Sequence, residues 1–109
     1  MIDIDIYKKS HRYSILATGH ARYAAHGYDI VCAAISTLLQ TYAFYLDKHI
    51  DDITILEIKL ESGDMNIEYL DENDIYKTNF EMVIEGLKAL EDTYPGFIKL
   101  NKMLENENL

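Results

Sequence analysis

The chain has 109 residues, 10 Lys and Arg against 19 Asp and Glu, and a formal net charge of −9. With 49% hydrophobic and 27% charged residues, its composition excludes a disordered chain and is typical of a single globular domain spanning residues 1–109. The acidic excess argues against a phosphate-binding surface, because affinity for nucleic acid comes largely from clustered Lys and Arg. We therefore expect no direct nucleic-acid partner.

The negative charge is concentrated in the second half of the chain. Residues 1–50 carry five basic and four acidic groups, whereas residues 51–109 carry five basic and fifteen acidic groups. Any acidic surface therefore belongs to the second half, where it favours encounter with basic partners.

The chain has one cysteine, Cys32, which excludes an intramolecular disulfide and a multi-cysteine zinc site. No basic segment followed by an apolar stretch opens the chain, so we expect a cytoplasmic location. Cys32 is then either an inert buried side chain or a reactive thiolate. The spacing of His11, His20, His26 and Cys32 matches no compact ligand pattern, and we expect neither a metal nor another cofactor.

The first fifth of the chain predicts an antiparallel hairpin. Residues 2–6 alternate strictly between apolar and acidic side chains, which is the period of a half-buried strand. A polar segment at 8–12 follows, and then a second β-prone run at 13–18.

A long uncharged helix is predicted over residues 30–46, with Asp29 as its N-cap. Such a helix is about 25 Å long, the short limit for crossing a bilayer, and it contains several polar side chains. We therefore expect a buried core helix and no membrane partner. Because a domain of this size has difficulty covering such a helix on every side, we expect part of it to face a second copy in a homodimer.

The second half of the chain predicts another hairpin and a second helix. Residues 53–61 and 65–70 alternate on either side of a Ser-Gly-Asp turn. The apolar positions of these strands are Leu56, Ile58 and Leu60, then Met65, Ile67 and Tyr69. A helix over about 75–94 follows several candidate capping residues at 71–74, and its apolar stripe consists of Phe80, Val83, Leu87, Leu90 and Tyr94.

The element order ββαββα predicts an α+β fold. The simplest way to bury these apolar faces is a four-stranded, mostly antiparallel sheet with two helices packed on one face. Residues 97–100 are either a short additional strand or a packed tail, and we expect the residues from 101 onward to be frayed.

The segment between the first hairpin and the first helix contains the residues most suited to catalysis. His20 follows a strand, and Cys32 lies in the first helical turn, where free N–H groups and the helix dipole favour a thiolate. His20 is the candidate general base, and backbone N–H groups near Cys32 are candidate donors to an oxyanion. Asp29 either only caps the helix or also orients His20, and its charge opposes formation of a thiolate.

These residues carry a resemblance to a known family. The sequence Gly-His-Ala at 19–21, followed by Gly-Tyr-Asp-Ile-Val-Cys-Ala at 27–33 and a serine at 36, resembles the ribosomal-processing cysteine protease family, called Prp. The separation of twelve residues between His20 and Cys32 fits this pattern.

The resemblance implies a small dimeric α+β protease with Cys32 as the nucleophile and His20 as the base. It also implies a substrate, the precursor of the bacterial large-subunit ribosomal protein numbered twenty-seven. Members of the family remove a short N-terminal extension from that precursor, and this cleavage is needed for ribosome assembly.

The resemblance further implies roles for residues around the catalytic pair. Asp29 and Ser36 would support the pair, and a substrate loop containing Gly19, Gly27 and Tyr28 would close over the peptide. An alternative from the sequence is a non-catalytic homodimeric module that binds a ribosome-assembly partner, with a structural cysteine. A redox-sensing thiol is a third possibility.

Overall fold

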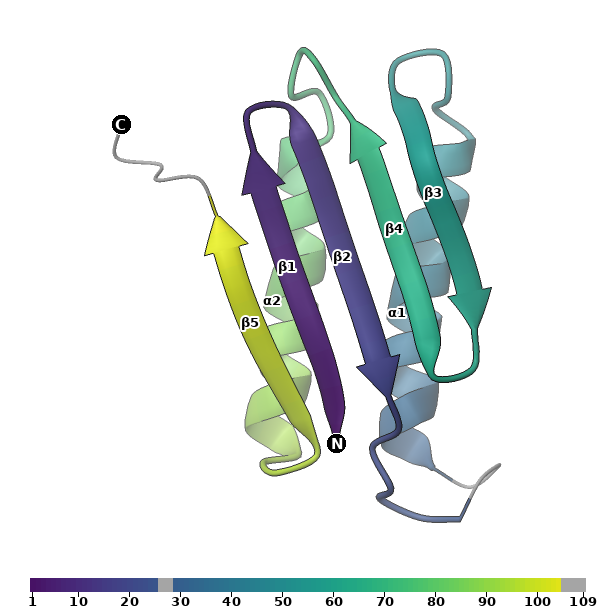
Figure 1. Ribbon diagram of the computed structural model, residues 1–109, viewed down its shortest axis with the longest axis vertical. Helices are drawn as coiled ribbons and strands as arrows, with labels where there is room; N and C mark the ends of the chain where they lie inside the picture. Colours follow the sequence, from purple (N-terminus) through teal and green to yellow (C-terminus); the bar gives the residue numbers. More distant parts are fainter. Residues whose placement is uncertain (26–28, 105–109) are drawn as a thin grey trace.

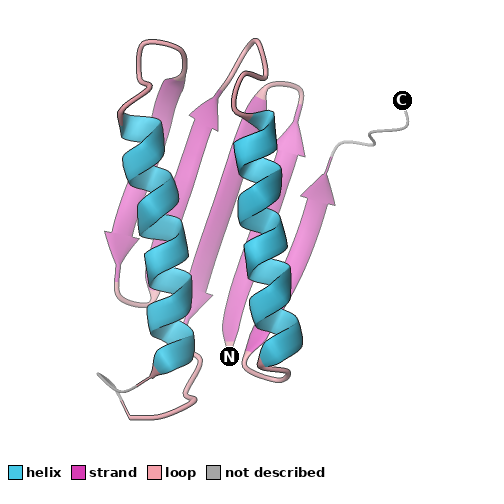
Figure 2. Ribbon diagram, turned by 180° about the vertical axis from the view of Figure 1, so that it is seen from behind, coloured by secondary structure: helices cyan, strands magenta, loops and turns pink. Residues whose placement is uncertain are grey.

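The computed structural model describes residues 1–25 and 29–104. In chain order, the elements of this part are β1 (Ile2–Lys9), β2 (Arg12–Gly19), α1 (Ile30–Asp47), β3 (Thr54–Glu61), β4 (Asp64–Leu70), α2 (Lys77–Thr93) and β5 (Ile98–Leu104). The strands form one sheet in the order β3-β4-β2-β1-β5, and both helices lie on the same face of it (Figure 1, Figure 2). The predicted α+β class, with two helices on one face, is confirmed.

The sheet has five strands and is mixed, so the prediction of a four-stranded, mostly antiparallel sheet was wrong in strand number. β5 pairs in parallel with β1, from Ile2 opposite Ile98 to Lys8 opposite Leu104, and this strand also replaces the expected frayed end over residues 101–104. Apolar and polar residues alternate over the first four residues of β5, but its parallel partner lies at the other end of the chain. Only the crossover through α2 brings the two strands together.

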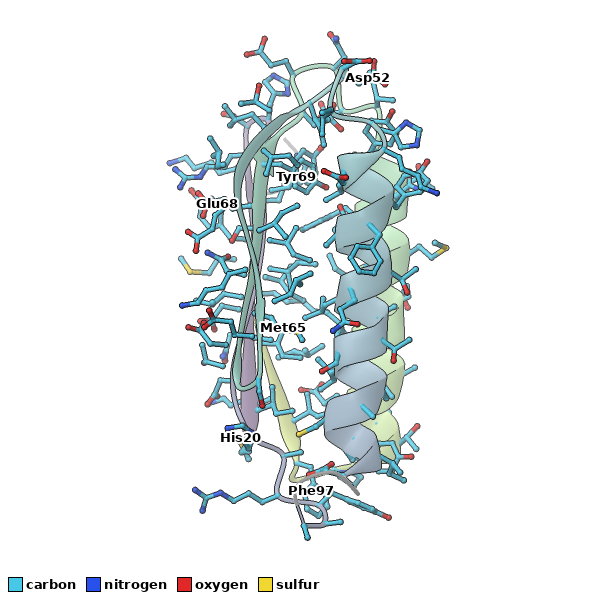
Figure 3. All side chains as sticks on the ribbon, turned by 90° about the vertical axis from the view of Figure 1, so that its right-hand side faces the viewer. His20, Asp52, Met65, Glu68, Tyr69 and Phe97 are labelled. Atoms are coloured by element: carbon cyan, nitrogen blue, oxygen red, sulfur yellow. The ribbon has the colours of Figure 1, made fainter. Side chains whose placement is uncertain are left out.

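The core lies between the sheet and the helices, as the side view in Figure 3 shows. The predicted alternation in β1 is confirmed, because Ile2, Ile4 and Ile6 are buried while the acidic residues between them are exposed. Their partner strand, β2, runs antiparallel and also pairs with β4. The first hairpin therefore contributes two inner strands, β1 and β2, and the second contributes one, β4.

The prediction for β3 was wrong at one position. Leu56 was expected to share the inner face with Ile58 and Leu60, but it is 46% exposed. The pairing of β3 with β4 shifts register between Ile55 and Glu57, as in a β-bulge, so the alternation changes phase there. The buried positions predicted for β4, Met65, Ile67 and Tyr69, are confirmed.

α1 packs one face against the sheet. By length and composition this helix is apolar enough to cross a membrane, but one third of its residues are buried inside the protein, in its hydrophobic core. Its buried residues are Val31, Ile35, Leu39, Tyr42, Ala43 and Leu46. α1 is therefore a core helix with an outer face that remains free in one copy of the chain.

α2 lies beside α1 and contributes the predicted stripe to the common core. Phe80, Val83 and Leu87 are buried, and Leu90 and Tyr94 pack partly buried against them. The α-helix begins at Lys77, two residues later than predicted.

The loop before α2 is held by two carboxylates. Asp71 is completely buried and accepts hydrogen bonds from the backbone N–H groups of Ile75 and Tyr76. The candidate cap at position 71 therefore satisfies buried N–H groups just before the helix. Asp74 accepts a hydrogen bond from the Tyr13 hydroxyl, and its other oxygen lies 3.3 Å from Nδ1 of His11.

The Asp74 contact predicts a loss of stability in acid. The Tyr13 hydroxyl, and to a lesser degree His11, hold the pKa of Asp74 below its ordinary value although partial burial opposes this shift. A lowered folded-state pKa contributes stability that is present above the ordinary carboxyl pKa of about 4 and is lost as the pH falls through the folded-state pKa. In urea unfolding, the stability advantage of the wild type over Asp74→Asn should therefore shrink as the pH falls below about 4. An advantage that stays constant from pH 7 to pH 3 would contradict this.

Candidate active site

Three segments meet at one end of the molecule. They are the C-terminal end of β2, the first turns of α1 and the turn between β3 and β4 (Figure 1). Together they line a cavity of about 590 Å³. The candidate residues His20, Cys32, Asp29, Ser36 and Gly19 all line this cavity. The structure thus brings five of the predicted site residues to one place.

Cys32 lies in the first turn of α1 and its side chain is half-buried. The backbone N–H of Ala21, the residue after His20, donates a hydrogen bond to Cys32 Sγ at 3.4 Å. The sulfur therefore accepts a backbone hydrogen bond at the N-terminus of α1, where the helix dipole is positive.

Asp29 is the N-cap of α1, as predicted. Its Oδ1 accepts hydrogen bonds from the N–H groups of Val31 and Cys32, both at 3.0 Å, and its Oδ2 accepts one from Tyr23 N–H at 2.9 Å. Partial burial acts to raise the pKa of the Asp29 carboxyl, but the N–H donors of Cys32, Tyr23 and Ala24 together hold it below the ordinary value. None of the hydrogen bonds of Asp29 in the described residues reaches His20, so the structure supports the capping role.

The N–H groups at the start of α1 are already engaged. Those of Val31 and Cys32 donate to the Asp29 side chain, and that of Ala33 donates to the Asp29 carbonyl oxygen at 3.1 Å. The expectation that such groups are open to an oxyanion is therefore wrong for these three. The Ala21 N–H is the donor that faces the sulfur.

His20 follows β2 directly, and its exposed side chain lies at the end of the sheet layer (Figure 3). Its ring lies against Gly63 in the β3–β4 turn. Within the described residues, no hydrogen bond joins His20 to Cys32, although both line the same cavity. The imidazole thus reaches the cavity from the end of β2, and the thiol from the first turn of α1.

The other predicted residues divide into two groups. Ser36 is one turn after Cys32 on α1 and faces the cavity, and Gly19 has a positive φ of 95° and ends β2. Gly27 and Tyr28, which were predicted to belong to the substrate loop, lie outside the described residues.

Some residues that line the cavity were not recognised from the sequence. They are Gln40 on α1, Leu60 and Met65 on the second hairpin, and Ser62, Gly63 and Asp64 in its turn. The Ser-Gly-Asp sequence was interpreted only as a turn. Its proximity to His20 depends on β4 pairing with β2, a contact for which the local sequence carries no signal.

Substitutions of Asp29 test whether this residue mainly caps α1 or mainly orients His20. We expect Asp29→Ala to lower the free energy of unfolding by about 0.5–2 kcal/mol, because two N–H groups at the helix start lose their acceptor. Asp29→Asn, which is a good N-cap, should recover most of this loss in urea unfolding. Asp64→Ala is the matched control, since it removes a cavity carboxylate that does not cap the helix. If Asp29→Asn is as unstable as Asp29→Ala, capping is not the main contribution of this residue.

Comparisons with known proteins agree with this geometry. The model of a family described as cysteine protease Prp matches residues 1–99 of the chain. The ribosomal processing cysteine protease Prp of Mycoplasma genitalium is 32% identical over 88 residues, which cover 81% of this chain and 86% of the relative. The protein of the same name from Mycoplasma pneumoniae is 28% identical over 99 residues, covering 87% of this chain and 92% of the relative.

Solved structures share the fold. The ribosomal processing protease Prp of S. aureus, crystallised with a covalently linked product peptide, superimposes with a TM-score of 0.79 at 24% identity. A second structure of it, in complex with a substrate peptide, has a TM-score of 0.73 at 23% identity. Each match covers 94% of this chain and 100% of the other. The family match over nearly the whole chain, joined to a cysteine at a helix start in a cavity, identifies the chain as a cysteine protease of the Prp family.

Proposed function

We propose that this protease removes the N-terminal extension of the precursor of large-subunit ribosomal protein twenty-seven, with Cys32 as the nucleophile and His20 as the general base. The observation that carries the proposal is the shared cavity, which places a helix-start cysteine and a strand-end histidine around a space that fits a peptide segment. The family assignment favours this protease over the binding module and the redox-sensing thiol that the sequence left open.

The proposed reaction has two steps. In the first, His20 takes the proton of the Cys32 thiol, and Sγ attacks the scissile carbonyl carbon. The tetrahedral intermediate then expels the amine of the C-terminal product, which receives the proton from His20, and a thioester remains on Cys32. In the second, His20 takes a proton from water, which attacks the thioester. This releases the new carboxyl group and restores the thiol.

The surroundings of Cys32 suit this sequence of steps. The Ala21 N–H donates to Sγ in the resting protein, and its position beside the sulfur makes it the candidate donor to the oxyanion. Asp29 holds the first turn of α1, and Ser36 extends the polar side of the cavity. In this proposal both residues position the site and neither reacts.

Two further observations support the substrate. The relatives are named ribosomal processing proteases, and the S. aureus protein was crystallised with a substrate peptide. A ribosomal protein is basic, and this chain has a formal net charge of −9. Opposite net charges accelerate encounter, most strongly at low salt.

The test is a cleavage assay with a synthetic peptide that spans the extension and the first residues of the mature ribosomal protein. Product masses should show one cut at the junction. A peptide of the same composition in scrambled order should stay intact. If neither the peptide nor the intact precursor is cut, or if the scrambled peptide is cut equally fast, the assignment of the substrate is wrong.

We also propose that the protease acts as a homodimer through the outer face of α1. This face carries no charge from residue 30 to 46, and Ile30 and Phe44 on it are 52% and 61% exposed. Light scattering at micromolar concentration should give the mass of a dimer, and Phe44→Glu should give a monomer. Met82→Glu, at an exposed position on α2, is the control and should stay dimeric. A monomeric wild type would overturn this proposal.

A further inference from the structure

We propose that Gly63, in the turn between β3 and β4, is a positioning residue for the His20 imidazole. This inference rests on the proposed role of His20 as the general base. The turn is distant from His20 in sequence, but it lies beside the end of β2 because β4 pairs with β2 (Figure 1). The second hairpin thereby becomes part of the catalytic site.

The contact itself requires a residue without a side chain. A Cβ added at Gly63 would lie 2.6 Å from Nε2 and 2.8 Å from Cε1 of His20. Both distances are far below the 3.5–4.0 Å at which nonbonded carbon atoms normally meet. The His20 ring therefore lies directly on the backbone of the turn, in a place that any other residue would fill.

The backbone on both sides of His20 is anchored, so the ring cannot adapt by a shift of the whole residue. Gly19 N–H donates to the Gly63 carbonyl oxygen at 3.0 Å, and Ala21 N–H donates to Cys32 Sγ. The backbone of Gly19 is thus hydrogen-bonded to the turn, and the backbone of Ala21 is hydrogen-bonded to the sulfur of Cys32. The His20 ring can therefore move only by rotation of its side chain, and the backbone of Gly63 blocks this rotation on one side.

A Cβ at position 63 would consequently rotate the ring away from its position at the edge of the cavity. A small displacement of a general base weakens proton transfer strongly, because the transfer requires hydrogen-bond distance and alignment. We expect Gly63→Ala to lower kcat for peptide cleavage about 10- to 100-fold with little change in KM.

The chain offers a matched control for backbone strain. Gly63 and Gly96 have φ values of +75° and +89°, so alanine is strained at both positions. A Cβ at Gly96 meets no atom within 4 Å, whereas one at Gly63 meets His20. Gly96→Ala should therefore reproduce the loss in thermal stability but keep the wild-type kcat. Gly63→Asn is the second variant, because asparagine tolerates this conformation and still carries a Cβ.

The experiment measures kcat, KM and the pH dependence of Cys32 alkylation by iodoacetamide in these variants and in His20→Ala. In Gly63→Ala and Gly63→Asn, kcat should be lower and alkylation of Cys32 near neutral pH should be slower than in the wild type. In Gly96→Ala, neither quantity should change. In the His20→Ala background, Gly63→Ala should cause no further loss, because the ring it displaces is gone.

Two outcomes would overturn the inference. Gly63 is not a positioning residue if its alanine variant matches Gly96→Ala in kcat, or if it lowers kcat equally with and without the His20 ring. The proposed role of His20 fails separately, if His20→Ala itself cleaves as fast as the wild type. Should Gly63→Ala fail to fold, Gly63→Asn decides by the same criteria.

Discussion

Replacing Cys32 by alanine should abolish peptide cleavage and leave the fold intact. If Sγ forms the thioester, its removal deletes the first chemical step, and losses of roughly 10⁴–10⁶-fold in kcat are typical for a deleted nucleophile. The cost in stability should be small, about 1 kcal/mol, because the side chain is only half-buried and alanine favours a helix. Mass spectrometry of the peptide products and thermal unfolding measure the two effects.

Because the chain has a single cysteine, labelling of Cys32 can be measured without a contribution from any other thiol. Iodoacetamide should add one group to each wild-type chain, and activity should disappear in proportion to labelling. Thr78→Ala, at an exposed position of α2 outside the cavity, is the control and should retain full activity. Cleavage that survives complete labelling, or that persists in Cys32→Ala, would exclude Cys32 as the nucleophile.

Removing the imidazole of His20 should have the next largest effect. General acid–base catalysis typically contributes 10²–10⁴-fold, and we expect a loss of that size in kcat for His20→Ala. The ring is exposed and lies on the surface of the turn at Gly63, so the melting temperature should change little. The same two measurements, mass spectrometry of the peptide products and thermal unfolding, quantify these effects.

His11→Ala is the matched control for His20→Ala. His11 is an exposed histidine in the β1–β2 turn, where it lies beside Asp74. Its replacement removes an imidazole of the same kind without touching the cavity, so cleavage should remain at the wild-type rate. A His20→Ala variant that retains more than about a tenth of the wild-type kcat would show that another group acts as the base.

Most of the fold could be predicted because its signals are local. The alternation in β1, the uncharged run that forms α1 and the stripe of α2 each reflect one element facing one core. The errors came from interactions between elements. The parallel strand β5 depends on a partner at the other end of the chain, and the exposure of Leu56 depends on a register shift against β4.

The candidate site divides in the same way. The residues His20, Asp29 and Cys32 were found because they lie within one segment at a strand end and a helix start, where residue type and position indicate chemistry. Gly63 and the other residues of the β3–β4 turn were missed, because a Ser-Gly-Asp sequence indicates a turn wherever the turn lies in the fold.

The sequence by itself determined the single cysteine, its place at the start of a helix, the capping carboxylate and the acidic net charge. The helix start and its cap depend on residues within one turn of each other, and the cysteine count and net charge follow from composition, so no long-range contact is needed to establish them. Only the tertiary structure decided which turn contacts the histidine, which N–H group donates to the sulfur, and which residues line the cavity. Those features depend on β4 pairing with β2, which brings the β3–β4 turn to the end of β2 and the start of α1 although it is far from both in the chain.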